Sequence, residues 1–410
     1  MKILAIETSC DETGLSILEV KESKNKLSFK VLATTLASQI KIHREYGGVY
    51  PMLAKREHIK HLPILLEKVL KKSKLGGSVA KSTWRPNRQV NTVSPVDLIV
   101  VTSGPGLEPA LWTGIVFAKE LSQKWNVPLI PVNHMEGHIL SPFGANAGDF
   151  EIPLTENKDS SISFPILSLL VSGGHTELVL IKDWGKYKVI GQTVDDAAGE
   201  AYDKVARMLD LPYPGGPEIS KLAEARRKFL LFENIAQADE PSIAIRQQAN
   251  MSVFKKQKLP IVIKLPRPMI YSKDFNFSFS GLKTAVLYLI RDLKIANPNV
   301  MENQNTKNDI ALEFENAVVE TLVHKTKKAI LKYKTKNLII AGGVSANKHL
   351  KNEINKMLKK LDFETQVFFP KKELTGDNSI MIAMAGFLKY TKNKTKIYKN
   401  IKAEGNLKLK

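Results

Sequence analysis

Cysteine is nearly absent from this 410-residue chain, and long apolar runs are absent altogether. The single thiol, Cys10, excludes an intramolecular disulfide and any zinc site built from a cysteine cluster. Without a run of about eighteen apolar residues, the sequence contains no candidate membrane span. The first ten residues lack the basic region and cleavage site of a signal peptide, and they include a glutamate, which transit peptides avoid. These absences predict a cytoplasmic protein in a reducing compartment.

Acidic side chains are scarce relative to basic ones, with 41 Asp and Glu against 61 Lys and Arg and a net charge of +20. Such an excess indicates attraction to a polyanion, with nucleic acid the leading candidate. Much of it lies in the lysine-rich stretch 389–410, where we predict no core residues. General solubility or a lysine-rich proteome would also explain part of the excess. The charge alone therefore leaves RNA binding and solubility as alternatives.

The apolar pattern predicts two related α/β domains that face each other across a cleft. The expected elements of the first half are a hairpin (1–19), a helix (51–72), a strand (97–103), a helix (110–125) and a strand (127–132). Those of the second half are a polar loop (144–161), a hairpin (165–184), a helix (194–209), an insertion (222–265) and a strand–glycine–helix unit (337–358). Both halves thus contain a hairpin and a later strand–glycine–helix unit. We expect one domain at 1–132, completed by about 375–395, a second at 133–374, and a basic tail at 396–410.

Two histidines four residues apart, His134 and His138, lie within the stretch VNHMEGHIL. This spacing places both imidazoles on one face of a helix, where they could share a metal ion. A peptidase motif would have its glutamate directly after the first histidine. Glu136 comes two residues after it and points away from the pair, so the peptidase interpretation is weak. A third ligand is needed, and Asp377 is the best candidate, although an aspartate there is commonly an N-cap.

Glycine-bearing turns follow several predicted strands, at LVSGG (170–174), AGGVSAN (341–347) and GPG (104–106). Backbone N–H groups in such turns can approach a phosphate closely, and one at a helix start suits a nucleotide. Each turn alone is common, but the three together favour a nucleotide site. In DDAAGEAYDK, the spacing of Asp196, Glu200 and Asp203 predicts one acidic helix face. It is either a solvated stripe or a partner for ribose hydroxyls.

These motifs together resemble one family. The chain contains, in order, ETSCDETG (7–14), GGVYP (47–51), GPGL (104–107), HMEGH (134–138), LVSGGHTEL (170–178), DDAAGEAYDK (195–204), YPGGP (213–217), FSFSGLKT (277–284), AGGVSAN (341–347) and GDN (376–378). They are similar to those of the bacterial TsaD family of tRNA threonylcarbamoyladenosine transferases, formerly described as O-sialoglycoprotein endopeptidases. The loop at 75–95, the segment 222–265 and the lysine-rich tail lie outside the pattern.

The resemblance implies an actin/hexokinase-like fold, with two ribonuclease H-like halves around a nucleotide cleft. It implies transfer of threonylcarbamoyl from threonylcarbamoyl-AMP to N6 of the adenosine 3′ of the anticodon, in tRNAs that read codons beginning with A. It also implies that His134, His138 and Asp377 bind one iron(II) or zinc ion. Glu12 is implied to deprotonate or orient the attacking amine. The residues implied to contact the adenylate are Leu170, Val171, Ser172, Gly173, Gly174, Asp203, Gly216 and Asn347. A TsaB-type paralogue and a TsaE-type ATPase are the implied partners, with a homodimer as the alternative.

The chain departs from the family pattern at a few positions. Met52 and Lys55 replace the usual residues after GGVYP, and Asn133 stands where a further histidine is frequent. Met52 puts in doubt any role carried by the usual carboxylate. Two rival functions remain: a small-molecule kinase of the same fold, which would bind magnesium through phosphates and carboxylates, and a non-catalytic paralogue, which is expected to lack HMEGH.

Overall fold

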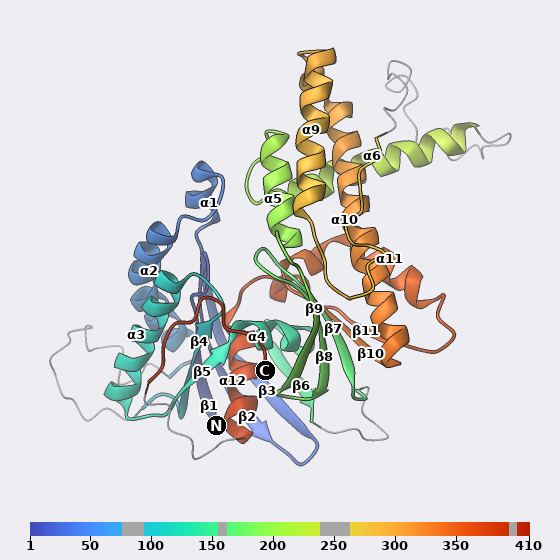
Figure 1. Ribbon diagram of the computed structural model, residues 1–410. Coiled ribbons are helices and arrows are strands. Elements are labelled where there is room, and N and C mark those ends of the chain that lie inside the picture. Colours follow the sequence, from blue (N-terminus) through green and yellow to red (C-terminus); the bar gives the residue numbers. More distant parts are fainter. Residues whose placement is uncertain (76–93, 155–161, 238–262, 393–399) are drawn as a thin grey trace.

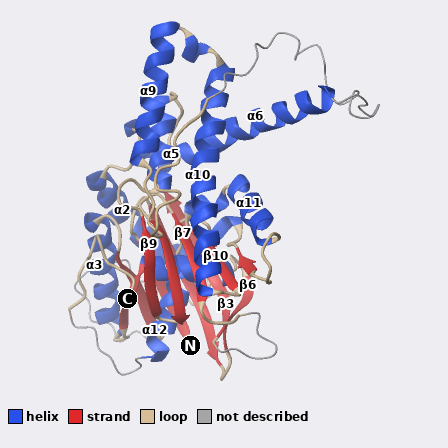
Figure 2. Ribbon diagram, turned by 45° about the vertical axis from the view of Figure 1, so that its right-hand side comes forward, coloured by secondary structure: helices blue, strands red, loops and turns tan. Residues whose placement is uncertain are grey.

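The computed structural model describes residues 1–75, 94–154, 162–237, 263–392 and 400–410. Two mixed β-sheets form the centre of the molecule (Figures 1 and 2). The strands of the first sheet are β1 (Lys2–Glu7), β2 (Glu12–Glu22), β3 (Lys26–Ser38), β4 (Leu98–Gly104), β5 (Leu129–Asn133) and β6 (Gly148–Pro153). Those of the second are β7 (Ile166–Val171), β8 (Thr176–Asp183), β9 (Lys186–Gln192), β10 (Asn337–Ala341) and β11 (Gln366–Phe368).

Both sheets have the same topology. The first has the order β5-β4-β1-β2-β3-β6, and the second β11-β10-β7-β8-β9. In each, three consecutive strands form an antiparallel meander, and two later strands add in parallel beside the first strand. The duplication expected from the sequence is therefore present, as two ribonuclease H-like halves of an actin/hexokinase-like fold. β4, β7 and β10 are fully buried, in keeping with their continuous apolar sequences.

Helices cover the outer face of each sheet and fill the space between them. The longer helices are α2 (Pro51–Lys72), α3 (Glu108–Trp125), α4 (His134–Leu140), α5 (Ala198–Met208), α6 (Gly215–Gln237), α9 (Ser280–Ala296), α10 (Gln304–Tyr333), α11 (Lys348–Leu358) and α12 (Ser379–Lys392). Shorter segments are α1 (Ile40–His43), η1 (Arg44–Tyr46), η2 (Ser141–Phe143), η3 (Val300–Glu302), η4 (Gly343–Ala346) and η5 (Lys372–Leu374). α6, α9 and α10 project beyond the sheets (Figures 1 and 2). Within the described residues, no helix meets the length and apolarity that crossing a membrane requires.

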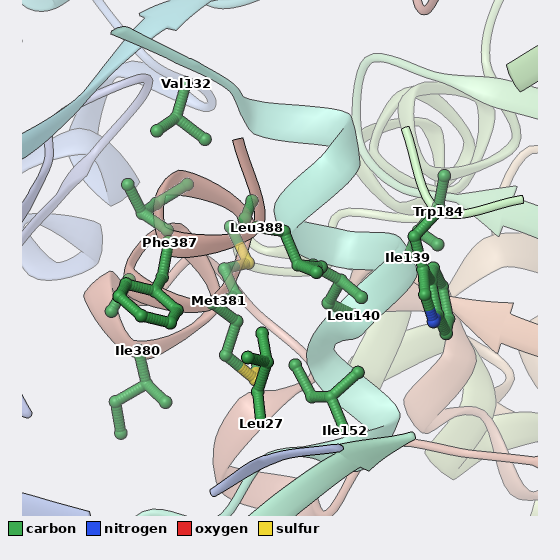
Figure 3. Packing of buried hydrophobic residues seen from close by; sticks show 14 of the residues in the cluster. Leu27, Val132, Ile139, Leu140, Ile152, Trp184, Ile380, Met381, Phe387 and Leu388 are labelled. Atoms are coloured by element: carbon green, nitrogen blue, oxygen red, sulfur yellow. The ribbon is translucent and has the colours of Figure 1, made fainter. Parts of the chain in front are cut away.

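One hydrophobic core joins the two halves. It contains Val132, Ile139 and Leu140 from β5 and α4, Trp184 from the second half, and much of α12 (Figure 3). Residues of both sheets pack against this layer, whereas α2 and α3 cover the opposite face of the first sheet with a separate core. The short histidine-bearing helix is thus fixed between the sheets by burial on several sides.

Three expectations need correction, and two strands were not predicted. The expected polar loop at 144–161 contains β6, which pairs with β3, so the division expected after residue 132 does not separate the two sheets. The expected insertion at 222–265 begins inside α6, and its residues 238–262 lie outside the described residues. The helix expected from residue 194 begins at Ala198. The sequence shows no clear strand pattern for β3 and β9, the third strands of the two meanders, because their exposed and buried positions alternate irregularly.

The end of the lysine-rich tail also differs from expectation. Residues 396–399 lie outside the described residues, but 400–410 pack on the protein, and Ile401 and Leu409 are buried in two different cores. Both residues have polar or charged neighbours in sequence, so no periodic apolar pattern indicates that they are buried. This C-terminal strap, residues 400–410, runs along the first half to the junction with the second (Figure 1).

Candidate metal and nucleotide site

The two histidines lie on α4, which follows β5 directly. Asn133 caps the helix, because its Oδ1 accepts a hydrogen bond from the α4 backbone at 2.8 Å. One helical turn separates His134 from His138, whose rings lie 4.6 Å apart. Gly137 allows α4 to approach α12, since a Cβ there would lie 2.9 Å from Met381 Cγ. The local sequence thus directs both imidazoles toward the start of α12.

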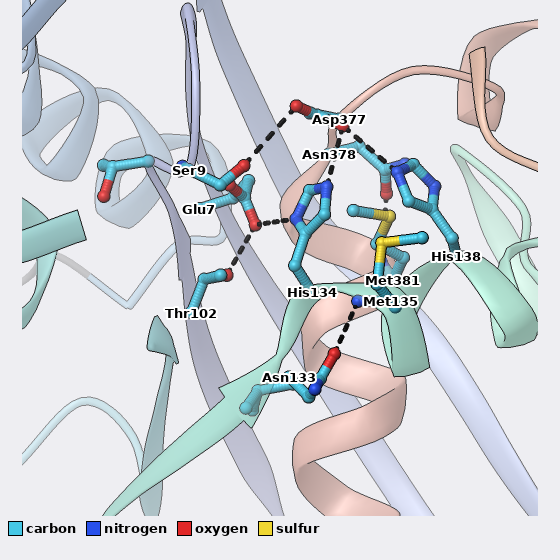
Figure 4. A network of polar contacts seen from close by, with 12 residues as sticks. Glu7, Ser9, Thr102, Asn133, His134, Met135, His138, Asp377, Asn378 and Met381 are labelled. Atoms are coloured by element: carbon cyan, nitrogen blue, oxygen red, sulfur yellow. Dashed lines mark hydrogen bonds and ion pairs between the residues drawn. The ribbon is translucent and has the colours of Figure 1, made fainter. Parts of the chain in front are cut away.

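Asp377 lies beside both histidines, just before α12 (Figure 4). Its Oδ1 is 3.1 Å from His134 Nε2 and 3.2 Å from His138 Nε2. The N-cap role that the sequence left open for Asp377 is filled by its neighbour, because Asn378 Oδ1 accepts a hydrogen bond from Met381 N at 2.9 Å. The Asp377 carboxylate is therefore free to face the histidines.

The arrangement of these three residues fits one metal ion. Two ligand atoms bound about 2.1 Å from one ion at tetrahedral angles lie about 3.4 Å apart, close to the separations here. One ligand atom from each residue falls within 4.8 Å of the others. His138 is fully buried, its Nδ1 makes no hydrogen bond within the described part of the chain, and its Nε2 has only the Asp377 carboxylate beside it. A shared ion would satisfy a buried group that is otherwise costly.

A buried carboxylate that the sequence analysis missed, Glu7, lies behind His134. Its Oε2 is 3.1 Å from His134 Nδ1, and Thr102 and the Ser9 backbone donate hydrogen bonds to Glu7. Burial opposes charge on His134, but the carboxylates of Asp377 and Glu7 outweigh it and raise the pKa of His134 well above its ordinary value. A carboxylate on Nδ1 fixes the tautomer that leaves Nε2 for a metal.

Glu12, at the start of β2, lies in an acidic surrounding. Burial, followed by the charges of Asp11 and Asp377, raises the pKa of Glu12 well above its ordinary value. Ser38 Oγ donates to Glu12 at 3.3 Å. A carboxylate with a raised pKa is a better proton acceptor, which suits the role that the resemblance implies. Burial also raises the pKa of the Cys10 thiol well above its ordinary value, so this cysteine is a poor nucleophile.

The predicted phosphate-binding turn follows β7. The side chains of Leu170 and Val171 are buried, so these two residues can reach a ligand only through their backbone. Gly173 and Gly174 are exposed, and a Cβ at either would meet no protein atom within 4 Å. His175 closes the turn, with its N–H donating to Ser172 Oγ at 3.2 Å. The open space above the glycines is where a phosphate could approach the backbone.

His175 is a further residue that the sequence analysis did not single out. Burial, and then the charges of His134 and His138, lower the pKa of His175 to about 4. The turn lies near this group, because the histidine-bearing helix α4 packs beside β7, the strand that the turn follows. The imidazole of His175 is therefore neutral at physiological pH and can donate or accept one hydrogen bond.

Asp203, on α5, contacts the start of α6, where Gly216 lies. Asp203 Oδ1 accepts a hydrogen bond from Gly215 N at 2.7 Å, and burial raises the pKa of Asp203. A Cβ at Gly216 would meet no protein atom within 4 Å. The same turn contacts the first half, because Arg44 Nε donates to Tyr213 O at 3.0 Å.

Asn347 already has protein partners for its side chain. Its Oδ1 caps α11 by accepting from Leu350 N at 2.8 Å, and its Nδ2 donates to Ser220 and Glu315 at 2.9 and 2.7 Å. These contacts place it at the start of α11, next to the turn after β10. A contact between Asn347 and the adenylate stays a prediction.

The single acidic helix face predicted from Asp196, Glu200 and Asp203 is wrong, because α5 begins after Asp196. Lys204 and Lys283 both pair with Asp196 at 2.8 Å, and Lys204 also pairs with Glu200 at 2.7 Å. Among the three acids, only Asp203 lies at the turn that faces the first half.

The neighbouring Asp195 explains why two of the motifs occur together. It accepts hydrogen bonds from Phe279 N at 2.8 Å and from Ser280 N at 3.2 Å, as well as from the hydroxyls of Ser278 and Ser280. DDAAGEAYDK and FSFSGLKT therefore bind each other, with Asp195 stabilising the start of α9. This contact is structural, and it engages both carboxylate oxygens of Asp195, which are therefore not available to a ribose.

The peptidase alternative gains no support from Glu136. It lies outside the His–His–Asp group, burial raises the pKa of its carboxyl, and Lys389 and Lys392 of α12 offset part of that rise. Glu136 is therefore not placed to act as general base for an ion held by that group.

A duplicated ribonuclease H-like fold defines an actin/hexokinase-like protein. Its candidate metal and nucleotide site consists of a His–His–Asp group in one half and open glycine turns in the other. The chain belongs to the tRNA N6-adenosine threonylcarbamoyltransferase (TsaD) family, a family of acyl-transferring enzymes, whose model matches residues 30–245 and 233–384. The resemblance drawn from the motifs is confirmed.

Curated relatives agree with this assignment. Proteins with that name from Burkholderia thailandensis and Burkholderia lata are 40% and 39% identical over 389 residues, which are 95% of this chain and 92% of each relative. Among solved structures, an activator of 2-hydroxyisocaproyl-CoA dehydratase from Clostridium difficile is 10% identical with a TM-score of 0.43, covering 98% of this chain and 99% of that one. HypF from T. kodakarensis is 14% identical with a TM-score of 0.41, covering 95% of this chain and 49% of that one.

Proposed function

We propose that this chain transfers the threonylcarbamoyl group from threonylcarbamoyl-AMP to N6 of the adenosine 3′ of the anticodon, in tRNAs that read codons beginning with A. Family membership supports the reaction class. The observation that carries the proposal is the convergence of His134, His138 and Asp377 next to β7, the strand that the open glycine turn at 173–174 follows. A kinase site would be expected to present carboxylates for magnesium in place of this imidazole pair.

The acyl donor, threonylcarbamoyl-AMP, would bind to the second half of the molecule. Backbone N–H groups of residues 170–174 suit the phosphate, because the exposed glycines leave room for close approach. Gly216 and Asn347 lie at the adjoining starts of α6 and α11, and Asp203 on α5 contacts the first of these starts. The three residues would contact the adenosine. The two halves would thereby position the acyl carbon between them, and such positioning supplies much of the rate for a weak nucleophile.

Glu12 would act on the attacking amine. As N6 of adenosine forms a bond to the carbamoyl carbon, the bond from that carbon to the phosphate oxygen breaks and AMP leaves. The amine then loses a proton, and the raised pKa of the Glu12 carboxylate favours accepting it. Burial is the largest cause of that raised pKa, and the charge of Asp11 adds to it, so both are part of the proposed mechanism.

We propose one divalent ion per chain, with iron(II) preferred over zinc, bound by His134, His138 and Asp377. When bound, the ion would supply a positive charge that stabilises negative charge on the donor. Glu7 would orient His134 for this purpose. We further propose a cytoplasmic location, recognition of tRNA by the basic surface, and cooperation with a TsaB-type paralogue and a TsaE-type ATPase, with a homodimer as the alternative assembly.

The test is reconstitution of the purified chain with an adenosine-containing tRNA transcript and threonylcarbamoyl-AMP, followed by nucleoside analysis. A parallel reaction supplies threonine, bicarbonate, ATP and the partner proteins. We expect threonylcarbamoyladenosine in the treated tRNA. It should be absent when guanosine replaces the target adenosine and when the His134→Ala variant is used. Glu136→Gln is the matched variant on the same helix and should remain active. ATP-dependent phosphorylation of a small molecule, without modified tRNA in either reaction, would contradict the proposal.

A further inference from the structure

The C-terminal strap binds closely to the first half of the molecule. Lys119 Nζ donates to Ile401 O at 2.9 Å, Glu404 N donates to Ser103 O at 2.8 Å, and Gly106 N donates to Gly405 O at 3.1 Å. The strap also explains why β4 ends in a glycine, because a Cβ at Gly104 would collide with Glu404 O of the strap. The GPG turn, predicted as a possible phosphate site, is therefore covered by the protein's own chain.

The strap then reaches the second half. Leu409 is 8% exposed and belongs to the core shared by both sheets. Tyr187 N, on β9, donates to Lys410 O at 3.4 Å. Burial raises the pKa of Glu177 on β8, and the charge of Lys408 offsets part of that rise. The last residues of the chain thus contact both sheets, next to the junction where α4 lies.

Asn133 connects this strap with the histidine-bearing helix. Its Oδ1 is engaged as the cap of α4, which requires its amide NH₂ to point the other way. That NH₂ donates to Lys408 O at 3.3 Å and to Leu407 O at 3.5 Å. Asn133 is 7% exposed, and the next residue is His134. One side chain therefore bonds to the helix start through its oxygen and to the strap through its nitrogen.

We propose that Asn133 is a positioning residue that couples the C-terminal strap to the metal ligands, so that docking of residues 404–410 sets the orientation of His134. The inference rests on the proposed metal site. Cap and strap fix the first turn of α4 from two sides, and groups that orient a metal ligand commonly change metal affinity by about 10-fold to 100-fold. Asn133 itself does not touch the substrate or the metal.

Full-length variants with zinc(II) as the probe test this coupling. Asn133→Ser keeps a cap oxygen but is too short to reach the strap, whereas Leu409→Ser loosens the strap without changing α4. We expect each variant to weaken zinc binding about 10-fold in competition with a chromogenic chelator. The double variant should be little weaker than either single one, because both changes break the same connection. Asn406→Ala, at an exposed strap position, is the control and should bind zinc normally.

The outcomes separate the inference from the proposed function. Unchanged zinc affinity in both single variants, or effects that multiply in the double variant, would overturn the coupling. If His134→Ala also binds zinc normally, the metal site itself is wrong, and if only His134→Ala loses zinc, the coupling alone fails. Thermal unfolding without metal identifies a variant that folds poorly, and Asn133→Asp, which keeps the cap and shape but loses the donor, then replaces it.

Discussion

Glu7 and His134 form a buried pair in which the carboxylate contacts Nδ1 at 3.1 Å while Asp377 approaches Nε2 of the same ring at 3.1 Å. The two ring nitrogens therefore have different environments. Because Glu7 also accepts hydrogen bonds from Thr102 and Ser9, it cannot rotate away without leaving both donors unpaired. The ring of His134 is thus oriented by residues from β1 and β4, far from it in sequence.

Replacing Glu7 with glutamine should weaken metal binding although the shape is conserved. The amide NH₂ can donate to Nδ1, which stabilises the tautomer with its proton on Nε2, where the metal must bind. We expect about a 10-fold increase in the zinc dissociation constant, measured by chelator competition. Glu19→Gln, at a half-buried position on β2, serves as the control. Equal zinc affinity of the Glu7 variant and the unaltered protein would show that Glu7 has only a structural role.

The Gly173→Val variant should lose nucleotide binding while it keeps its stability. No protein atom lies within 4 Å of a Cβ at Gly173, so the larger side chain fills only the space proposed for the phosphate. We expect AMP affinity to fall at least about tenfold, or about 1.4 kcal/mol, by calorimetry. Gly199→Ala is the contrasting variant. Its Cβ would lie 2.6 Å from Ser172 O, so this substitution should lower the melting temperature. Equal losses of stability and AMP binding in Gly173→Val would make Gly173 an ordinary hairpin residue.

Asp195→Asn should destabilise the protein in a pH-dependent manner. Burial opposes its charge, but hydrogen bonds from Ser278, Ser280 and Phe279 outweigh this and lower the pKa of Asp195. A carboxyl whose folded-state pKa lies below its unfolded value contributes stability at neutral pH and loses it as the pH falls through the folded-state pKa. We expect a loss of about 1 kcal/mol at pH 7, as for a helix cap, that disappears in acid. Denaturant unfolding from pH 7 to 3 measures it, with the exposed Asp149→Asn as the control. A loss that is constant with pH would exclude the charge as its cause.

The sequence predicted features that depend on local pattern. The spacing of His134 and His138 correctly predicted one helix face, and buried apolar runs correctly predicted strands such as β4 and β7. Two hairpins followed by strand–glycine–helix units correctly indicated the duplicated fold. In each case the periodicity of a short segment carries the information, because burial on one or both faces requires it.

Features that depend on contacts between distant segments were not predictable in the same way. Nothing near Glu7 indicates that it lies behind His134, 127 positions later in the chain. Asp377 and Asn378 are adjacent polar residues, and only the fold decides that Asn378 is the cap. The strap is anchored by Ile401 and Leu409, two isolated apolar residues among charged ones, whose burial depends on surfaces formed elsewhere.

The excess of positive charge should serve tRNA binding, and the structure changes how this is tested. Truncation near Tyr390 would remove the buried Ile401 and Leu409, so a loss of affinity could reflect lost packing. Exposed basic residues where the two halves meet offer a cleaner choice, since a Cβ at Gly47 would lie 3.9 Å from Arg207 Cδ. Lys41 and Arg207 come from the two halves, and Arg44, which donates to Tyr213 O, lies beside Lys41. If tRNA binds where the two halves meet, we expect its phosphates to contact these side chains.

We expect tRNA affinity of the full-length protein to fall steeply with salt, by roughly one power of salt concentration for each neutralised phosphate. The combined Lys41→Ala and Arg207→Ala variant should weaken binding at low salt and lower the slope by about two, because each residue removes one phosphate contact. Lys359→Ala with Lys360→Ala, at exposed positions after α11 on another side of the molecule (Figure 1), is the control for charge alone. The measurement is fluorescence anisotropy with labelled tRNA between low and near-physiological salt. If the slope of the unaltered protein is near zero, or the two variants change it equally, the basic residues at the site do not recognise tRNA and a partner protein must supply the contact.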